Sequence, residues 1–285
     1  MAYPISQGTS LVACCMSFCY REQYTRPPLA EVIRKFWVMD NARNPAAVRN
    51  KSVLPNSCFN LAFVAGGGMD IHNRRGQLTM PAGVYFCGQA RRAVDVVLLP
   101  FTHVTMVQLH PWTPARLDST SLADTADVIV PLGEVLSTLY EAVQFLLLDH
   151  ETPIISFFQT HFARYLVADE PPLLRRACQR FQQTKGALAV GALAEELGCS
   201  TRLLEKQFRQ YLGLTPKEFT TVLRVRGVVD ALQTPGANQA LAQVALEYGF
   251  YDQAHFIHAF RKMVQFSPGK FNPADYMLPL TGTGY

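Results

Sequence analysis

Histidine and cysteine side chains are the groups in this sequence best suited to chemistry, and their spacing limits what they can do. His255 and His258 lie three positions apart in the stretch HFIHAF, and on a helix two such residues share one face whatever their role. Paired imidazoles could hold a metal ion or move a proton. No histidine, cysteine or carboxylate nearby completes a metal-ligand pattern, so we expect no metal and no other cofactor here.

The other candidate ligands are scattered along the chain. His72, His103 and His110 form no compact His-x-His group with a following glutamate, so no catalytic metal is expected among them. The cysteines contain no CxxC element, and their odd number is typical of a reducing cytoplasm. They are Cys14, Cys15, Cys19, Cys58, Cys87, Cys178 and Cys199. The sequence assigns no role to the cluster formed by the first three.

Motifs of catalysis are missing from the sequence as well. The stretch AGGGMD has three glycines but no G-x-G-x-x-G opening a helix, and it is more typical of a hairpin turn. We find no phosphate-binding loop, nucleophile elbow or acid–base pair. The sequence therefore indicates no catalytic residue, and we expect a protein that is not an enzyme.

The composition, with 49% hydrophobic and 17% charged residues in 285, is typical of a globular protein. No apolar run approaches the roughly 18 residues of a membrane helix, and no basic residue precedes the apolar patch near the start, so we expect a cytoplasmic protein. Charge is uneven, because residues 1–174 hold 13 basic and 14 acidic side chains, whereas residues 175–285 hold 13 and 8. The basic C-terminal part predicts contact with a polyanion.

The elements that must position these groups fall into two regions. Residues 34–117 contain short β-branched or aromatic runs between turn signals, which predict a sandwich or small barrel. The runs are FWVM, CFNLAFVA, GVYFCG, AVDVVLL and HVTMVQL. After Thr120 the period becomes helical, with an apolar stripe along residues 132–149 and a second helix after Pro153. These helices either cover the barrel or form a subunit interface, and the long stripe favours a homodimer.

From Leu173 onward the chain reads as short helices and repeats itself. LAEELGCSTRLLEKQFRQYLGLTPKEF can be laid over VALEYGFYDQAHFIHAFRKMVQFSPGKF, with one residue of difference in the turn. In each copy a glycine (Gly198, Gly249) stands where a helix C-cap needs a left-handed residue, and an N-cap residue (Ser200, Asp252) follows it. Such a unit predicts a helix-turn-helix, whose second helix can enter the DNA major groove.

Both second helices carry an apolar pair at i,i+4 that would fix them in a small core. The pairs are Leu204 with Phe208 and Phe256 with Phe260. The outward face of the first helix carries Arg202, Glu205, Lys206 and Arg209, which suit base edges and phosphates. Between the copies, PKEFTTVLRVRGVVDALQ predicts one long helix of roughly 24 Å, so that a single chain could read a bipartite site.

Residues 173–276 resemble the DNA-binding domain of the AraC/XylS family of transcription regulators. The stretches that carry the resemblance are the two repeated segments and LRVRGVVDAL. It implies sequence-specific binding to the major groove of double-stranded DNA, with activation through RNA polymerase as the family's usual mode. Its base-facing positions fall on Arg202, Glu205 and Lys206, and on Gln253, Ala254, Ile257 and His258. We expect Ser200, Thr201, Arg209 and Arg261, on the same two helices and their caps, to contact DNA as well.

Three positions depart from that family's pattern. Gln265 stands where glycine is usual, Ala254 where a polar residue is common, and His258 where arginine is common. The second helix is therefore poorer in strong DNA contacts, and we expect the first copy to supply most of the sequence reading. His258 is then a pH-sensitive substitute for arginine, and His255 a helix-surface residue.

The front region is similar, more weakly, to the cupin-like barrel found before some AraC-type domains. The resemblance implies a sensing or dimerising module, and we expect either a small molecule or a partner to act on it; a barrel of this kind can enclose one small ligand. Candidate lining residues are Trp37, Phe59, Phe63, Tyr85, Phe86 and Phe101, with filling of the barrel as the other interpretation. Two alternative functions are a DNA-alkylation repair or regulatory protein with a cysteine-based N-terminal module, and a cupin-type enzyme with an accessory helical domain.

The expected fold is α+β: a β-barrel or sandwich with following helices, then an all-α domain of two helix-turn-helix motifs joined by a long helix. We divide the chain into an extension (1–20), a sensing and dimerisation domain (21–168), a linker (169–172, DEPP), a DNA-binding domain (173–276) and a tail (277–285).

Overall fold

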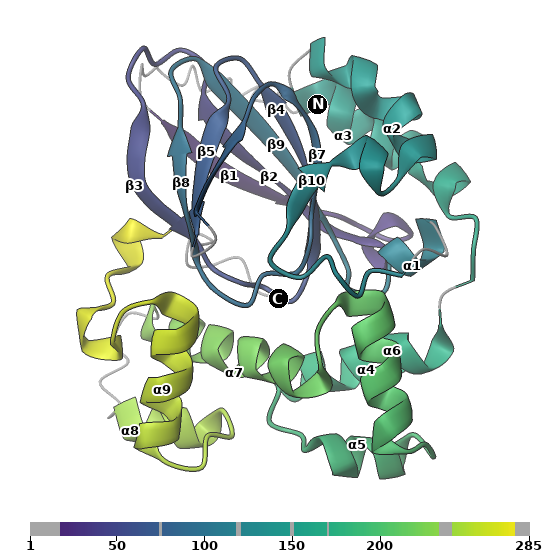
Figure 1. Cartoon of the computed structure of the whole chain (residues 1–285), viewed down its shortest axis with the longest axis vertical. Coiled ribbons are helices and arrows are strands. Elements are labelled where there is room, and N and C mark those ends of the chain that lie inside the picture. Colours follow the sequence, from purple (N-terminus) through teal and green to yellow (C-terminus); the bar gives the residue numbers. More distant parts are fainter. Residues whose placement is uncertain are drawn as a thin grey trace, which may run out of the picture.

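The computed structural model describes residues 18–73, 76–117, 121–148, 151–169, 171–233 and 241–276. Cys14 and Cys15, with the rest of residues 1–17, and the predicted tail lie outside these ranges. The α+β fold is confirmed: an antiparallel β domain is followed by a helical domain (Figure 1). None of the described helices has the length and apolar character needed to cross a lipid bilayer.

Two antiparallel sheets face each other in the front domain. The first has the order β1 (Cys19–Tyr24), β2 (Ile33–Asn41), β9 (Thr102–Leu109), β4 (Phe59–Ala65), β7 (Gly83–Cys87), β10 (Ile129–Pro131). The second has the order β3 (Val48–Val53), β8 (Val94–Leu98), β5 (Met69–Asn73), β6 (Gly76–Met80). Met39 and Val104 of the first sheet pack with Ile71 and Leu98 of the second in one buried cluster between them.

The outer face of the six-stranded sheet is covered by helices. They are α2 (Ser137–Val143) and α3 (Glu151–Thr160), with 3₁₀ turns at Leu132–Glu134, Gln144–Leu148 and Phe162–Tyr165. The ring of Phe158 lies 6.3 Å from that of Phe36 and 5.9 Å from that of Phe63. Leu139 and Val143 of the apolar stripe belong to the same core. The stripe therefore covers the sheet, and it no longer supports a subunit interface.

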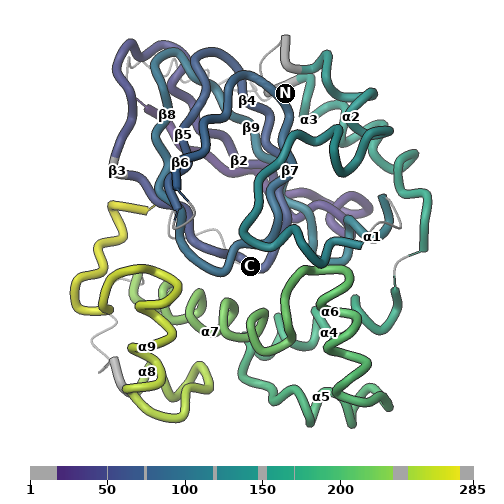
Figure 2. Tube along the Cα trace, viewed as in Figure 1, coloured from purple at the N-terminus to yellow at the C-terminus, as the bar shows by residue number. Residues whose placement is uncertain are grey.

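The helical domain contains six α-helices within the described residues, and Figure 2 follows their path. They are α4 (Pro172–Gln183), α5 (Val190–Glu196), α6 (Thr201–Leu212), α7 (Pro216–Leu232), α8 (Leu241–Glu247) and α9 (Gln253–Val264). Short 3₁₀ turns at Pro268–Lys270 and Pro273–Asp275 follow α9. The front domain contains a further 3₁₀ turn at Leu29–Glu31 and the short helix α1 at Pro114–Leu117. The single long helix expected between the copies is α7, whose 17 residues span about 26 Å.

The predicted caps of both helix-turn-helix units are confirmed. Gly198 and Gly249 adopt left-handed φ angles of +64° and +76°. The Ser200 hydroxyl accepts a hydrogen bond from the Leu203 N–H (3.2 Å), and the Asp252 carboxylate accepts one from the His255 N–H (2.7 Å). These bonds satisfy N–H groups that the first turn leaves without partners, so each helix begins where the sequence predicts.

Two separate apolar cores hold the helical domain together. In the first, Phe208 of α6 packs against Phe181 and Phe219, at ring distances of 5.9 Å and 5.4 Å. In the second, Phe256 and Phe260 of α9 pack against the C-terminal half of α7. The i,i+4 apolar pairs are all fully buried, as the repeat predicts.

Candidate nucleic-acid interface

The two candidate reader helices, α6 and α9, stand at opposite ends of α7 with their C-terminal ends toward the sheets (Figure 1). Backbone hydrogen bonds fix this orientation. The Leu122 N–H donates to Gln210 O near the end of α6 (2.8 Å), and the Ala93 N–H donates to Met263 O near the end of α9 (2.7 Å). Their N-terminal halves therefore point away from the front domain on one side of the molecule, where a DNA duplex could approach both.

The face of α6 that points away from its core is polar and exposed. Leu204 and Phe208 are fully buried on the other face. Every DNA-facing position proposed on this helix is exposed: Ser200, Thr201, Arg202, Glu205, Lys206 and Arg209. Three of the four charged residues are basic, which suits phosphates and guanine edges.

The corresponding face of α9 carries weaker hydrogen-bonding groups. Gln253, Ala254, His258 and Arg261 are exposed, and Ile257 is half-buried. His255 is exposed as well, with its ring 5.4 Å from that of Phe250 in an edge-on contact. Among the described residues, no group of three or more His, Cys, Asp or Glu side chains could hold a metal ion.

Two exposed apolar side chains on this surface were not foreseen. Leu203 in the first turn of α6 is 41% exposed, and Tyr251, just before the α9 N-cap, is 87% exposed. An aromatic residue in a polar turn is the signal that could have pointed to Tyr251. Both side chains are available to thymine methyl groups or sugar surfaces.

Arg224 ties the α7 spine to both halves of the helical domain. Its Nε donates to Gly186 O after α4 (2.7 Å), and its Nη1 donates to Gly249 O in the turn after α8 (3.0 Å). Partial burial lowers the pKa of the guanidinium, but arginine remains charged at any physiological pH. The turn that precedes α9 is thus held by a residue of the spine.

Comparisons with known proteins agree with this geometry. A family model described as a helix-turn-helix domain matches residues 193–273, and a domain family of unknown function (DUF6597) matches residues 22–131. An uncharacterized HTH-type transcriptional regulator of Haemophilus influenzae is 29% identical over 32% of this chain and 30% of its own length. The HTH-type transcriptional activator RhaS of Salmonella arizonae is 32% identical over 27% of each chain. The C-terminal part of this chain is an AraC-type helix-turn-helix domain.

The alignments span less than a third of these relatives' length, so they characterise the AraC-type domain and not the whole protein. A solved structure of ToxT from Vibrio cholerae covers 89% of this chain and 96% of its own, with 10% identity and a TM-score of 0.44.

Within the AraC-type domain, the departure at Gln265 has a structural counterpart. Gln265 is the C-cap of α9 and adopts a left-handed φ of +73°, which explains why glycine is favoured there. Its side-chain Nε2 donates to Ala93 O of the front domain, at 2.8 Å. A glycine could not make this contact.

A cavity of about 500 Å³ lies between the two sheets and opens toward the AraC-type domain. Its wall is mostly apolar, with Met39, Ile71 and Met106 among the lining residues beside the polar Asn60, and its mouth includes Glu218, Lys262 and Gln265. Burial raises the pKa of the Cys87 thiol in its wall to about 12, so this thiol stays protonated. The cavity can therefore accept a small, largely apolar molecule.

Of the six aromatic residues expected to line a ligand site, Trp37 lines this cavity. Phe59, Phe63 and Phe86 are buried on the other face of the six-stranded sheet, under the covering helices. The Tyr85 hydroxyl donates to Pro81 O (2.9 Å), and Phe101 is 56% exposed. These five residues are not among those that form the cavity wall.

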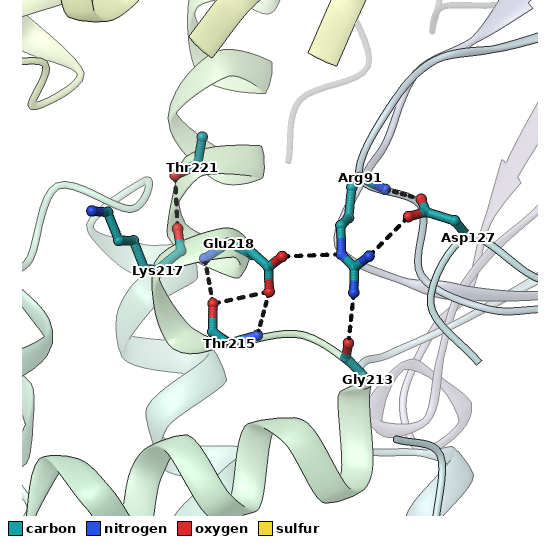
Figure 3. A network of polar contacts seen from close by, with 7 residues as sticks. All are labelled: Arg91, Asp127, Gly213, Thr215, Lys217, Glu218 and Thr221. Atoms are coloured by element: carbon teal, nitrogen blue, oxygen red, sulfur yellow. Dashed lines mark hydrogen bonds and ion pairs between the residues drawn. The ribbon is translucent and has the colours of Figure 1, made fainter. Parts of the chain in front are cut away.

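Figure 3 shows a polar network that joins Arg91 and Asp127 of the front domain to the AraC-type domain. Arg91, Asp127 and Glu218 also line the cavity. Arg91 Nε lies 3.1 Å from Glu218 Oε1, and Arg91 Nη1 lies 3.1 Å from Asp127 Oδ2. Partial burial raises the pKa of Glu218, but the hydrogen bonds from Thr215 and the charge of Arg91 outweigh it and lower that pKa below its usual value. Glu218 is thus a carboxylate at neutral pH, held at the start of α7.

Proposed function

We propose that this protein is a transcription regulator that binds double-stranded DNA at a bipartite site, with α6 and α9 entering successive major grooves. The observation that carries the proposal is the common orientation of the two helices, whose exposed N-terminal halves point away from the sheets at either end of α7 (Figure 1). Groove-to-groove spacing on one face of B-DNA is about 34 Å, and the ~26 Å spine with a helix at each end has the scale to meet it.

In this proposal α6 is the main reader of sequence. Arg202 and Lys206 can donate to guanine O6 and N7, and Glu205 can accept from a cytosine amino group. α9 offers Gln253 for an adenine, but its other groups are weaker, with His258 at a position where arginine would bind more strongly. Arg209 and Arg261 are assigned to phosphates.

The proposal includes control by a small molecule that binds between the sheets. The cavity mouth is formed in part by Glu218, Lys262 and Gln265 of the AraC-type domain and by Arg91 of the front domain. A ligand in the cavity would therefore contact groups that hold the two domains together, and it could favour one arrangement over another. The chemical character of the wall favours an effector that is mostly apolar with one polar group.

We divide the roles along the chain as follows. Residues 21–168 act as the cupin-like sensing unit, and residues 173–276 act as the DNA reader. Activation through RNA polymerase, a homodimeric state and a cytoplasmic location complete the proposal as features usual for such regulators.

Selection of bound sequences from random DNA by the purified full-length protein tests the proposal. Arg202→Ala and Lys206→Ala should each reduce discrimination between selected and unselected DNA by about tenfold or more, whereas His258→Ala should reduce it by less than about threefold. Arg176→Ala is the matched control, because this exposed arginine lies on α4, outside both readers. Enrichment of no sequence would contradict the function, and equal losses would contradict the ranking of the helices.

A further inference from the structure

The loop between β7 and β8, residues 88–93, contacts the ends of both reader helices. Arg91 Nη2 donates to Gly213 O at the C-cap of α6 (3.3 Å), and the same guanidinium pairs with Glu218 in the first turn of α7 (Figure 3). Two residues later, the Ala93 N–H donates to Met263 O at the end of α9 (2.7 Å). One short loop therefore touches two helices that are separated along α7.

The two C-caps that meet the front domain are equivalent positions of the repeat, Gly213 and Gln265. Both adopt left-handed φ angles, +67° and +73°. A Cβ atom on Gly213 would lie 2.8 Å from Leu122 O, so the front domain approaches α6 too closely for any side chain there. Gln265 keeps a side chain at a conformational cost, and that side chain donates to Ala93 O. Each C-cap is thus adapted to contact with the front domain.

Within the AraC-type domain, the two readers are joined by α7 and by contact between the turns that follow α4 and α8, where Lys185 Nζ lies 5.2 Å from the centre of the Tyr248 ring. The N-terminal part of this helix, at Phe219, belongs to the core of α6, whereas Val225 and Val229 belong to the separate core of α9. The front domain contributes to both cores, with Leu122 in the first and Ala93 in the second. The front domain is therefore a further connection between the readers, in addition to those within the AraC-type domain.

We propose that the 88–93 loop sets the distance and angle between α6 and α9, so that Arg91 and Gln265 determine which spacing of DNA half-sites the protein prefers. This inference rests on the proposed function. The reading faces of both helices stay exposed while these contacts are made, so the docked arrangement is compatible with DNA binding. Arg91 and Gln265 act as positioning residues. Arg91 contacts the C-cap of α6 and Gln265 is the C-cap of α9, so both lie at the opposite ends of these helices from their exposed N-terminal halves.

The test uses the full-length protein and a DNA library in which the two selected half-sites are separated by spacers that differ by one base pair. The wild type should prefer one spacing over its neighbours by about tenfold, since a misplaced half-site loses contacts worth that factor or more. Gln265→Gly and Arg91→Met should each lower the preference to about threefold or less, and the double variant should nearly abolish it. The preferred bases within each half-site should stay the same.

The variants are chosen so that loss of folding does not mimic the effect. Glycine is the least strained residue at position 265, so Gln265→Gly keeps or raises the melting temperature while it removes the contact with Ala93. Arg26→Met is the matched control for charge, because Arg26 is an exposed arginine of the front domain that does not line the cavity between the sheets. Its spacing preference should equal that of the wild type.

The outcomes separate this inference from the function on which it rests. A wild type that selects two half-sites but whose spacing preference is unaffected in the double variant would overturn the role of the loop and leave the proposed function intact. A wild type that tolerates all spacings equally would have the same consequence. A protein that enriches no DNA sequence would refute both proposals.

Discussion

Arg91 Nε lies 3.1 Å from Glu218 Oε1, and this ion pair joins the front domain to the first turn of the helix that carries both readers. Glu218 also completes a capping box with Thr215, accepting hydrogen bonds from its N–H (2.8 Å) and its hydroxyl (2.9 Å). The carboxylate of Glu218 thus both caps the start of α7 and lies at the cavity mouth. Contact between the domains and the geometry of the spine are coupled through it.

A double-mutant cycle on Arg91→Met and Glu218→Gln should measure this coupling. Both side chains are more than a third exposed, so solvent screens the pair and its interaction free energy should be about 0.5–1 kcal/mol. Urea unfolding of the four proteins at pH 7 gives the value. A coupling free energy of zero would mean that the two side chains do not interact in solution.

The same cycle has a defined pH dependence. The pKa of Glu218 is lowered in the fold, so the stabilisation is present above the unfolded-state value of about 4.3 and is lost as pH falls through the lower folded-state pKa. The coupling at pH 7 and at pH 6 should therefore be equal. A coupling that disappears between these two pH values would contradict the assignment.

His110 should make the whole chain less stable in mild acid. Its ring stacks on Trp112 at 4.6 Å and its Nε2 hydrogen bonds with Ala30 O (3.0 Å), and burial lowers its pKa to about 4. Because the unfolded histidine binds a proton near pH 6.5 and the folded one does not, stability falls as pH drops from 6.5 to 4, by up to about 3 kcal/mol. Urea unfolding at several pH values measures this, and His110→Gln should flatten the profile in that window. An unchanged slope in the variant would show that another group is responsible.

Replacing the equivalent buried phenylalanine of each helix-turn-helix copy by alanine should show whether the two apolar cores unfold independently. Phe208→Ala and Phe260→Ala each remove a fully buried ring and should cost about 3–5 kcal/mol. Phe208 belongs to the core that continues into the sheet domain, whereas Phe260 belongs to the smaller one. Hydrogen exchange should therefore show Phe260→Ala loosening α8 and α9 while the sheets stay protected. Equal loss of protection in the sheets would indicate a single cooperative core.

The sequence predicted β2, β4, β7, β8 and β9 because they are rich in buried apolar residues. β1, β3, β5, β6 and β10 were missed. Of these, β1 and β6 are sheet-edge strands whose side chains are mostly exposed or half-buried, so they lack a long apolar run. The sequence did not show which of the aromatic residues line the cavity between the sheets. In β4, Phe59 and Phe63 face the covering helices while Ala62 and Val64 face the other sheet, and both faces are buried. Period-two alternation then gives no sign of which face holds the cavity.

The sequence predicted more of the candidate DNA surface, because both copies of the repeat contain the same kinds of helix-capping residues and the same buried apolar pair. The sequence did not predict the contacts of Arg91, because its partner Gly213 is 122 residues away along the chain. The departure at Gln265 was visible as an exception to a family pattern, but its reason lies in a backbone carbonyl that the sequence cannot place. Local sequence patterns predicted the two reader helices, whereas contacts between residues distant in sequence determine how these helices are fixed against the front domain.

Filling the cavity should remove binding of an apolar probe. Met106 lines the cavity wall, so Met106→Trp should place an indole in the space and weaken binding of 1-anilinonaphthalene-8-sulfonate by about fivefold or more. Leu78→Trp is the matched control, because it adds the same ring on β6, where Leu78 is 37% exposed. Fluorescence titration measures both. Equal affinity of the dye for the wild type and Met106→Trp would show that it does not bind between the sheets.

Methylation protection of guanine N7 in a selected site, bound by the full-length protein, tests the central claim most directly, because that atom lies in the major groove. The account predicts two protected segments on one face of the duplex, with centres about 10–10.5 base pairs apart, and loss of one segment in Arg202→Ala. A single protected segment, or none in the major groove, would contradict the claim that α6 and α9 both read DNA.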